Sequence, residues 1–345
     1  MNIIRLALLG FGNAAQSFAS LLIEKESEIQ QTYGVKPMVT AITTKSRGSL
    51  YNPLGIDLRQ ALDDIASKGH FDEEREEFSL SSSIEVVGAA EYDVLIELTP
   101  LNIFSGEPAI QHIQGALFRG KDVITANKGP IAWAYQSLKT LAHEKGCLFF
   151  YETTVMDGTP VFNLVQENLR LCKVIEIEGI LNSTTNYILE ELALGNDIDK
   201  IMEEGKGRGF IEADPEMDTQ GWDGAAKLTA LMNVLMDANM TPDQIHRKGI
   251  DGISGDTIQE AKSRGKVIKV VCHGEIQGGE IVGSVEPVEV DEKGLLGSIR
   301  GTSSVVSITT DLMGKVSIIE HDPEIQQTGY GVLSDLLRLL VIKTI

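Results

Sequence analysis

Hydrophobic positions in the first 150 residues come in short runs that alternate with helical patterns. The run Ile3–Leu9 is almost entirely apolar, and after a glycine-rich turn Phe18 and Leu22 recur at helical spacing. The same alternation continues through Asp93–Leu98, Pro108–Phe118, Asp122–Ala126, Pro130–His143 and Cys147–Tyr151. Strands that alternate with helices predict βαβ units, so residues 1–150 are expected to form an α/β domain with a doubly wound parallel sheet.

The pattern changes after Tyr151, where apolar runs lie among helical stretches without regular alternation. The predicted strands there are Val174–Ile177, Lys266–Cys272, Ile281–Val285 and Val305–Thr309. They predict a mixed α+β domain over residues 151–330. The final segment, residues 331–345, is amphipathic and is expected to form a helix that packs back on the first domain. The polar segment Tyr51–Ser83, with its charged run Asp72–Glu77, predicts a solvated helical insertion.

A glycine turn directly follows the first predicted strand, where residues 10–15 read GFGNAA. In a Rossmann-type fold, Gly10 would make the tight turn, Gly12 would let a pyrophosphate approach the backbone, and Ala15 would permit close helix packing. Amides at the helix start would bind the phosphates. The glycines could also form a plain turn, but their place after a buried strand favours a dinucleotide site. Its residues would be Gly10, Phe11, Gly12, Asn13 and Ala14.

The second predicted strand, Val35–Thr43, ends without the acidic residue that would hydrogen-bond the ribose diol of NAD. It runs instead into a loop that carries Lys45 and Arg47 together with several hydroxyl groups. Two cations at this position suit the additional phosphate of NADP. The sequence therefore predicts NADP as the cofactor, with NAD left open, unless Lys45 and Arg47 are ordinary loop charges.

Composition and charge exclude several classes of protein. The chain has 345 residues, 42% of them hydrophobic, and a formal net charge of −20. Such an excess of acids repels nucleic acid and anionic membranes, so neither is expected as a partner. No apolar run approaches the length of a membrane span and no leader pattern is present, which predicts a cytoplasmic protein. The three cysteines and six histidines match no zinc-binding spacing.

A loop rich in carboxylates, residues 207–221, precedes a predicted helix that starts at Trp222. On this helix Asp223 and Lys227 are four residues apart and therefore share one face. The pair could be an ordinary surface ion pair beside a solvated loop. It could also present a carboxylate and an ammonium together to a ligand.

Three further segments lie where a ligand crevice is expected. Thr99 and Pro100 close one buried strand and Lys128 follows the next, at the carboxyl ends where ligands bind in open α/β sheets. Lys128 could hold a carboxylate or polarise a carbonyl group there. The third segment, residues 182–187, could cap a helix at Thr184 or Thr185 and still line a polar pocket.

Together these segments resemble the homoserine dehydrogenase family over nearly the whole chain. The motifs that carry the resemblance are GFGNAA, ELTPLNIFSGEPA, TANKGP, GILNSTTNYIL and, most specifically, EADPEMDTQGWDGAAK. The resemblance implies that the protein reduces L-aspartate 4-semialdehyde to L-homoserine with NADPH or NADH, a step toward threonine and methionine. It also implies a short form of the enzyme without the C-terminal regulatory domain that senses threonine in many members.

The resemblance further assigns roles to individual residues. Lys227 would be the proton donor and acceptor, with Asp223 beside it, and Lys128 would lie at the nicotinamide and the substrate. Glu212 would bind the amino group of the substrate, because an ammonium is best held by carboxylates. The other expected substrate-binding residues are Asp218, Thr184 and Asn182.

Residues 152–160 are similar to the loop on which this family holds a structural monovalent cation, sodium. The oxygen donors would come from Glu152, Val155, Asp157 and Thr159. Hard oxygen donors without sulfur are consistent with such an ion.

One position departs from the family pattern. Ser183 stands where members usually carry glycine, and its hydroxymethyl group could narrow or re-aim the pocket. This leaves open an NADP oxidoreductase acting on another small amino-acid-like carbonyl. A catalytically inactive dinucleotide-binding sensor stays open as an alternative of a different class. The edge strands of the second domain predict a homodimer, because pairing them between subunits would cover them.

Overall fold

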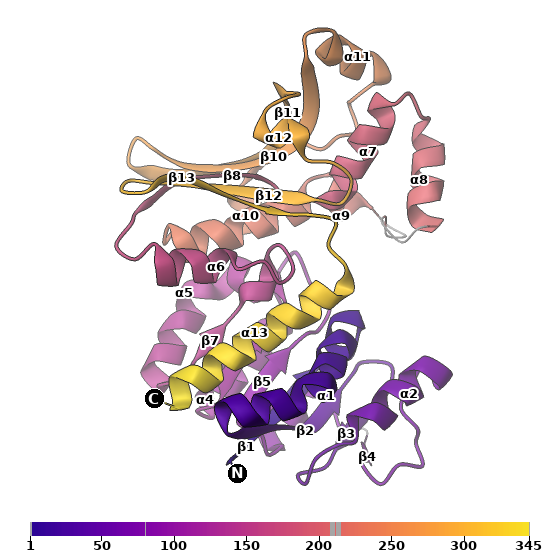
Figure 1. The fold of residues 1–345 in the computed structure, drawn as a ribbon, viewed down its shortest axis with the longest axis vertical. Coiled ribbons are helices and arrows are strands. Elements are labelled where there is room, and N and C mark those ends of the chain that lie inside the picture. The colour runs from indigo at the N-terminus through magenta and orange to yellow at the C-terminus, as the bar shows by residue number, and fades with distance from the viewer. Residues whose placement is uncertain (1, 80, 208–210, 212–214, 345) are drawn as a thin grey trace. The chain divides into compact units, whose positions relative to one another are not determined.

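The computed structural model describes residues 2–79, 81–207, 211 and 215–344 (Figure 1). The chain divides into two units, residues 1–160 with 324–345, and residues 161–323. These limits differ from the expected 1–150 and 151–330 because the loop after residue 151 packs on the start of the last helix. A Cβ atom on Gly158 would lie 2.3 Å from the Gln327 carbonyl oxygen, so this contact requires glycine.

The first unit is built on a seven-stranded sheet in the order β4-β3-β2-β1-β5-β6-β7. Strands β2, β1, β5, β6 and β7 are parallel, as the sequence predicts, whereas β3 and β4 pair antiparallel at one edge. The strands are β1 (Asn2–Leu9), β2 (Val35–Thr43), β3 (Ser49–Tyr51), β4 (Phe78–Ser79), β5 (Val94–Glu97), β6 (Asp122–Thr125) and β7 (Phe149–Phe150).

Helices cover both faces of this sheet, which makes it doubly wound. They are α1 (Asn13–Tyr33), α2 (Leu58–Lys68), α3 (Ser83–Ala89), α4 (Ala109–Phe118), α5 (Lys128–Lys145), the short 3-10 helix η1 (Glu152–Thr154) and α13 (Ile325–Thr344). One face has a core that joins Phe18 of α1 to Leu336 of α13. The other face has a core formed by α3, α4 and α5, with Ile113 and Leu138 at its centre.

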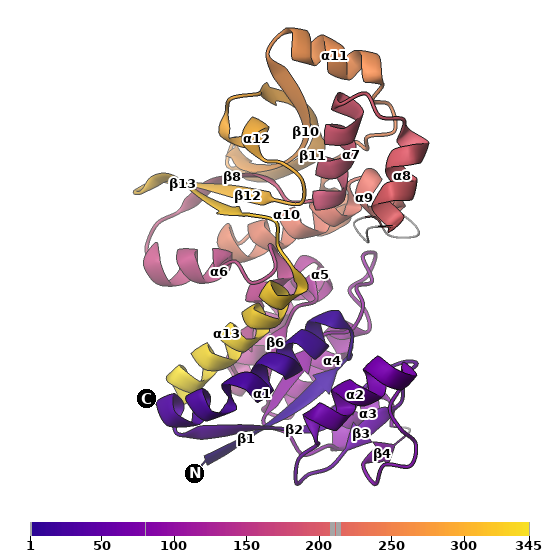
Figure 2. The same ribbon diagram turned by 45° about the vertical axis from the view of Figure 1, so that its right-hand side comes forward.

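Helix α13 begins at Ile325, before the expected start at residue 331, and lies alongside α1 in both views (Figures 1 and 2). Its buried apolar residues recur three and four positions apart, so they form one stripe along the helix. This stripe consists of Val332, Leu333, Leu336, Leu339 and Leu340. Among the described residues, no helix has both the length and the apolar character that a membrane span requires.

The polar segment Tyr51–Ser83 is not the uniform helical insertion that its composition predicts. Within this segment α2 is helical as far as residue 68, whereas β3 and β4 are strands that widen the sheet at one edge. The charged run forms turns, and inside it the Arg75 side chain is only 2% exposed. Its guanidinium lies 3.1 Å from Asp64 and 3.3 Å from Glu77, and these two ion pairs permit an arginine to be buried.

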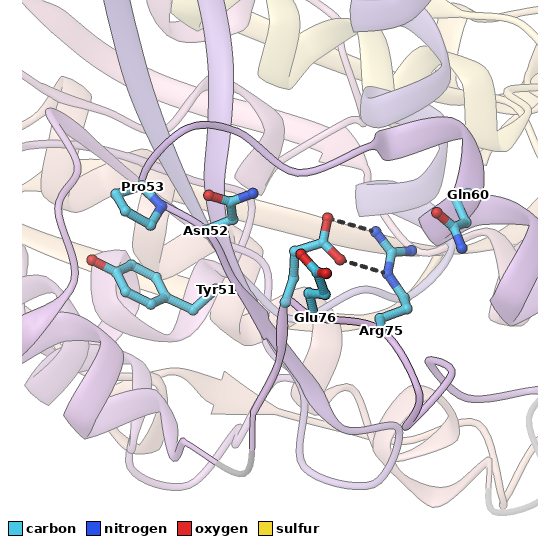
Figure 3. Close-up of a pocket in the computed structure, with 7 residues that line it drawn as sticks. Tyr51, Asn52, Pro53, Gln60, Arg75 and Glu76 are labelled. Carbon is cyan, nitrogen blue, oxygen red and sulfur yellow. Dashed lines mark hydrogen bonds and ion pairs between the residues drawn. The ribbon is translucent and has the colours of Figure 1, made fainter.

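A cavity of about 430 Å³ lies beside this arginine, lined by Tyr51–Pro53, Gln60 and Arg75–Glu77 (Figure 3). The charge of Arg75 is neutralised by two carboxylates, so it does not offer a free cation to an anionic ligand. None of the predicted cofactor or substrate residues lines this cavity.

The second unit has a six-stranded sheet in the order β13-β12-β8-β10-β11-β9, antiparallel except for the pair β11 and β9. Its strands are β8 (Val174–Ile180), β9 (His246–Arg247), β10 (Lys266–Gln277), β11 (Glu280–Asp291), β12 (Ser304–Thr310) and β13 (Gly314–Glu320). Its helices are α6 (Val161–Asn163), the π-helix η2 (Leu164–Asn168), α7 (Ser183–Ala193), α8 (Ile198–Gly207), α9 (Glu216–Thr219), α10 (Trp222–Leu235), η3 (Pro242–Gln244), α11 (Gly255–Ser263) and α12 (Leu295–Ser298). The predicted mixed α+β architecture is confirmed.

Candidate active site

The glycine turn after β1 is held tightly against the neighbouring strand β5. Gly10 has a φ of 93°, in the left-handed region that glycine favours. A Cβ atom at Gly10 would lie 2.4 Å from the Leu98 carbonyl oxygen, which leaves no room for any side chain. The Gly10 amide also donates to the Thr43 carbonyl at 2.8 Å, so this turn connects the ends of β1, β2 and β5.

The second glycine of the motif faces open space. Gly12 is the N-cap of α1, and a Cβ atom there would meet no heavy atom of the described residues within 4 Å. Packing within the protein therefore does not require glycine at this position, whereas close approach of a phosphate would. Asn13 and Ala14 follow as the first helical residues, where backbone amides can bind an anion, and Phe11 is buried beneath the turn. These features fit the pyrophosphate of a dinucleotide.

The loop between β2 and β3 brings a cation to the glycine turn. Arg47 is half-buried and donates a hydrogen bond from Nη1 to the Phe11 carbonyl oxygen at 3.1 Å. Lys45 is exposed in the same loop. Arg47 therefore lies next to the turn that the sequence predicts for the cofactor.

The other predicted residues of this unit follow β5 and β6. Thr99 and Pro100 come after β5, and Asn127 donates from Nδ2 to the Thr99 carbonyl oxygen at 3.0 Å. Asn127 is also the N-cap of α5, so Lys128 is the first helical residue, and it is half-buried. The carboxyl ends of β1, β2, β5 and β6 thus present the predicted residues along one edge of the sheet, where open α/β sheets bind ligands.

In the second unit, Asp223 and Lys227 lie side by side on α10. Lys227 Nζ is 2.8 Å from Asp223 Oδ2 and donates to the Leu181 carbonyl oxygen at 2.6 Å. The side chains are 20% and 14% exposed, so this is not the solvated surface pair that the sequence left open. The expected juxtaposition of an ammonium and a carboxylate on one helix face is confirmed.

Asn182 joins this pair to Asp218. Its Nδ2 donates to Asp218 Oδ1 at 2.6 Å and to Asp223 Oδ2 at 2.9 Å. Its Oδ1 accepts from the Thr185 amide at 2.8 Å, which makes Asn182 the N-cap of α7. The cap expected at Thr184 or Thr185 is therefore wrong, because the preceding asparagine takes that role. The sequence signal was present, since asparagine is among the strongest N-cap residues.

Burial controls the protonation of two groups in this cluster. Burial, and next the charge of Asp223, raise the pKa of the Asp218 carboxyl, although hydrogen bonds from Asn182 and Thr184 act in the opposite direction. Burial raises the pKa of Cys272 to about 12, so its thiol stays neutral at ordinary pH.

Two further positions singled out from the sequence are Glu212 and Ser183. Glu212 lies outside the described residues. Ser183 is half-buried as the first residue of α7, next to Asn182.

The loop predicted to hold a cation lies in the first unit. Glu152 and Val155 are buried, while Asp157 and Thr159 are half-buried. Asp157 Oδ1 accepts a hydrogen bond from Thr328 of α13 at 2.7 Å. In the described part of the chain, no three histidine, cysteine, aspartate or glutamate side chains are grouped as a metal site would be. The predicted donors include backbone oxygens, so the cation stays a prediction.

Comparisons with family profiles and with individual known proteins point to the same family. The family profile for homoserine dehydrogenase matches residues 160–337, and that for its NAD-binding domain matches residues 10–152. A homoserine dehydrogenase of Methanocaldococcus jannaschii is 34% identical over 96% of this chain and 97% of its own length. An NAD(+)-dependent homoserine dehydrogenase of Pseudomonas canavaninivorans is 32% identical over 97% of this chain and 96% of its own.

A solved structure has the same fold. A hyperthermophilic archaeal homoserine dehydrogenase in complex with NADPH superposes with a TM-score of 0.83 at 26% identity, covering 99% of this chain and 98% of that one. A dinucleotide-binding sheet and a second unit with a lysine and carboxylate cluster define an NAD(P)-dependent oxidoreductase. The profile matches and the relatives identify the family within this class. The chain belongs to the homoserine dehydrogenases.

The raised pKa of Asp218 predicts a pH-dependent gain in stability when its charge is removed. Above that pKa the folded protein carries a half-buried ionised carboxylate, which destabilises it relative to the unfolded chain. Asp218→Asn should therefore melt at a higher temperature than the wild type at neutral and alkaline pH. The difference should shrink as the pH falls toward the ordinary aspartate pKa of about 3.9.

Thermal melting from about pH 4 to mildly alkaline pH tests this, with exposed Asp251→Asn as the matched control. A gain from Asp218→Asn that is independent of pH, or a loss at alkaline pH, would contradict the assignment.

Proposed function

We propose that this protein interconverts L-homoserine and L-aspartate 4-semialdehyde, with NADP as its preferred cofactor. The observation that carries the proposal is the Lys227 cluster at the start of α10, where an ammonium, Asp223 and Asp218 are joined through Asn182. Family membership supports this substrate over the two alternatives that the sequence left open.

Lys227 acts as the proton donor and acceptor. Oxidation of a primary alcohol requires that the hydroxyl lose a proton, and the reverse reaction requires a proton at the forming alkoxide. The Leu181 carbonyl and Asp223 both hold the Lys227 ammonium, so its position is fixed before substrate binds. The nicotinamide, when bound, supplies or accepts the hydride.

Asp218 and Glu212 bind the substrate ammonium, with Thr184 and Asn182 beside them. Because burial and Asp223 disfavour the ionised form of Asp218, a cationic ligand gives that carboxylate a compensating partner. Binding of an ammonium therefore relieves an electrostatic cost of the empty site. Lys128, at the start of α5, serves at the nicotinamide and the reacting carbonyl.

The NADP preference rests on Arg47 and Lys45. Arg47 is anchored on the Phe11 carbonyl beside the glycine turn, and Lys45 is exposed in the same loop. The residues of the turn itself would hold the pyrophosphate, and Thr99 and Pro100 would lie against the nicotinamide half. The relatives differ in cofactor, since one is named as NAD(+)-dependent and another was solved with NADPH.

The proton-transfer role predicts a large loss of turnover on Lys227→Ala. Loss of a positioned acid and base typically costs about 10²- to 10⁴-fold, and we expect that loss in kcat for homoserine oxidation. Lys227→Arg should be equally impaired, because a guanidinium keeps its charge but does not release its proton. The assay is NADP⁺ reduction followed by nicotinamide absorbance.

Exposed Lys262→Ala in the same unit is the control and should keep wild-type turnover. Normal kcat in Lys227→Ala would remove Lys227 from the mechanism.

The cofactor assignment predicts a selective effect of Lys45→Ala. A charge-assisted contact to a phosphate is worth about 1.5–3 kcal/mol, so KM for NADP⁺ should rise by roughly tenfold or more. KM for NAD⁺ should not change, because NAD lacks that phosphate. Arg47→Ala should affect both nucleotides, since Arg47 also holds the Phe11 carbonyl.

Lys145→Ala, at the opposite end of α5 from Lys128, is the control for an exposed lysine. Equal effects of Lys45→Ala on both nucleotides would contradict a phosphate contact.

The protein is further proposed to be a homodimer that uses the sheet of the second unit. Strand β13 is an edge strand of that sheet and leaves Ile319 39% exposed. Pairing such an edge with a second copy would cover it. Sedimentation velocity should give twice the chain mass of 37.5 kDa, and a species of that single mass alone would refute the dimer.

A structural sodium ion on the loop Glu152–Thr159 is proposed by the same family resemblance. A melting temperature that does not change when sodium is replaced by choline would argue against it.

A further inference from the structure

Glu97 is an acidic residue that is completely buried at the end of β5. Its Oε1 accepts hydrogen bonds from both the amide, at 3.3 Å, and the hydroxyl of Thr99. Its Oε2 accepts no hydrogen bond within the described part of the chain. A buried carboxylate with one unsatisfied oxygen costs folding free energy, so its presence calls for an explanation.

His112 extends this contact away from the turn. It lies on α4, is 1% exposed, and has Nδ1 at 3.4 Å from Glu97 Oε1. Its Nε2 is 2.8 Å from the hydroxyl of Ser83, the first residue of α3. A carboxylate can only accept, so His112 Nδ1 donates to Glu97, while Nε2 lies at hydrogen-bond distance from the Ser83 hydroxyl. Four side chains from α3, α4, β5 and the following turn thus form one chain of hydrogen bonds.

This chain ends at the peptide on which the glycine turn rests. A Cβ atom on Gly10 would lie 2.4 Å from the Leu98 carbonyl oxygen and 3.1 Å from the Thr99 nitrogen. The Thr99 amide that donates to Glu97 is therefore part of the peptide that contacts Gly10. The Thr99 carbonyl, at the other side of that residue, accepts from Asn127. Thr99 is thus fixed through its amide, its hydroxyl and its carbonyl.

We propose that Glu97 and His112 are positioning residues for the dinucleotide. Glu97 fixes Thr99 through two hydrogen bonds, and His112, itself held by Ser83, fixes the carboxylate. The turn at Thr99 and Pro100 is thereby set at a constant place relative to Gly10 before the cofactor arrives, which lowers the ordering cost of binding. The inference rests on the proposed cofactor role of Thr99 and Pro100.

The proposal differs from a purely structural role in what it predicts. A structural hydrogen bond would change stability and leave nucleotide affinity unchanged. A positioning residue changes nucleotide affinity, and it does so only through Thr99. The two possibilities therefore separate in a double-mutant cycle.

The experiment measures the dissociation constant of NADPH by fluorescence titration, KM for NADP⁺, kcat, and melting temperature. The variants are Glu97→Leu, Glu97→Gln, Thr99→Val, Thr99→Ser and the double variant Glu97→Leu with Thr99→Val. Thr99→Ser keeps the hydroxyl donor and should bind NADPH as the wild type does. Glu97→Leu and Thr99→Val should each weaken NADPH by roughly tenfold, the size expected for a lost hydrogen bond to a charged group.

The double variant should bind no more weakly than the weaker of its two parents, because both changes remove the same contact. KM for NADP⁺ should rise in parallel while kcat changes little. Val94→Ala, which is buried at the opposite end of β5, is the control, and should lower the melting temperature without changing NADPH affinity. Thr99→Val is near in size to the native side chain and keeps the test available if Glu97→Leu does not fold. Glu97→Gln keeps an oxygen that can accept from Thr99, so it should bind NADPH more tightly than Glu97→Leu.

Three results would overturn the proposal: wild-type NADPH affinity in folded Glu97→Leu or Thr99→Val, additive losses in the double variant, or a loss in Thr99→Ser as large as in Thr99→Val. Failure of the proposed function would look different. A wild-type protein that binds NADPH but does not oxidise L-homoserine would refute the proposed substrate. The binding titrations would still decide the role of Glu97.

Discussion

The cofactor edge of the first unit depends on the contact between Gly10 and the Leu98–Thr99 peptide. This contact requires a residue without a side chain in a left-handed conformation, and it requires that β1 and β5 be neighbours. The pairing of parallel strands brings these two chain segments together, and burial of apolar residues by α1 and α13 fixes the pairing. The geometry of the cofactor edge is therefore a consequence of how the core is packed.

In the second unit, the arrangement of the candidate site depends on Asn182. One amide side chain caps α7 through its oxygen and holds Asp218 and Asp223 through its nitrogen. Because the same residue starts a helix and orients two acids, the fold of α7 and the arrangement of charge at α10 depend on each other. Such a site is difficult to change one residue at a time, since replacing Asn182 would expose two carboxylates to each other and uncap a helix.

Much of this arrangement follows from sequence patterns that act locally. Alternating apolar runs predicted the parallel sheet, and the four-residue spacing of Asp223 and Lys227 predicted their contact. The predictions were wrong where contacts with residues distant in the sequence determine whether a side chain is buried. Arg75 lies in a run that reads as solvated, yet Asp64 and Glu77 permit its burial. Sequence patterns also could not find the contact of Glu97 with His112, because α4 and β5 bring the two together across 15 positions of the chain.

The two units use buried acids in different ways. One oxygen of Glu97, Oε1, accepts from donors that belong to the protein, so it is occupied in holding Thr99 and His112. Asp218 lies beside another carboxylate, and burial together with that neighbour raises its pKa despite the opposing effects of Asn182, Thr184 and Lys227. A further cation would therefore stabilise its ionised form. A carboxylate oxygen held by donors of its own chain gives rigidity, whereas a carboxylate whose charge is disfavoured by burial and by a like charge would gain from binding an ammonium. In the proposed function, the stability given up at Asp218 is the basis on which this site would recognise the ammonium of its substrate.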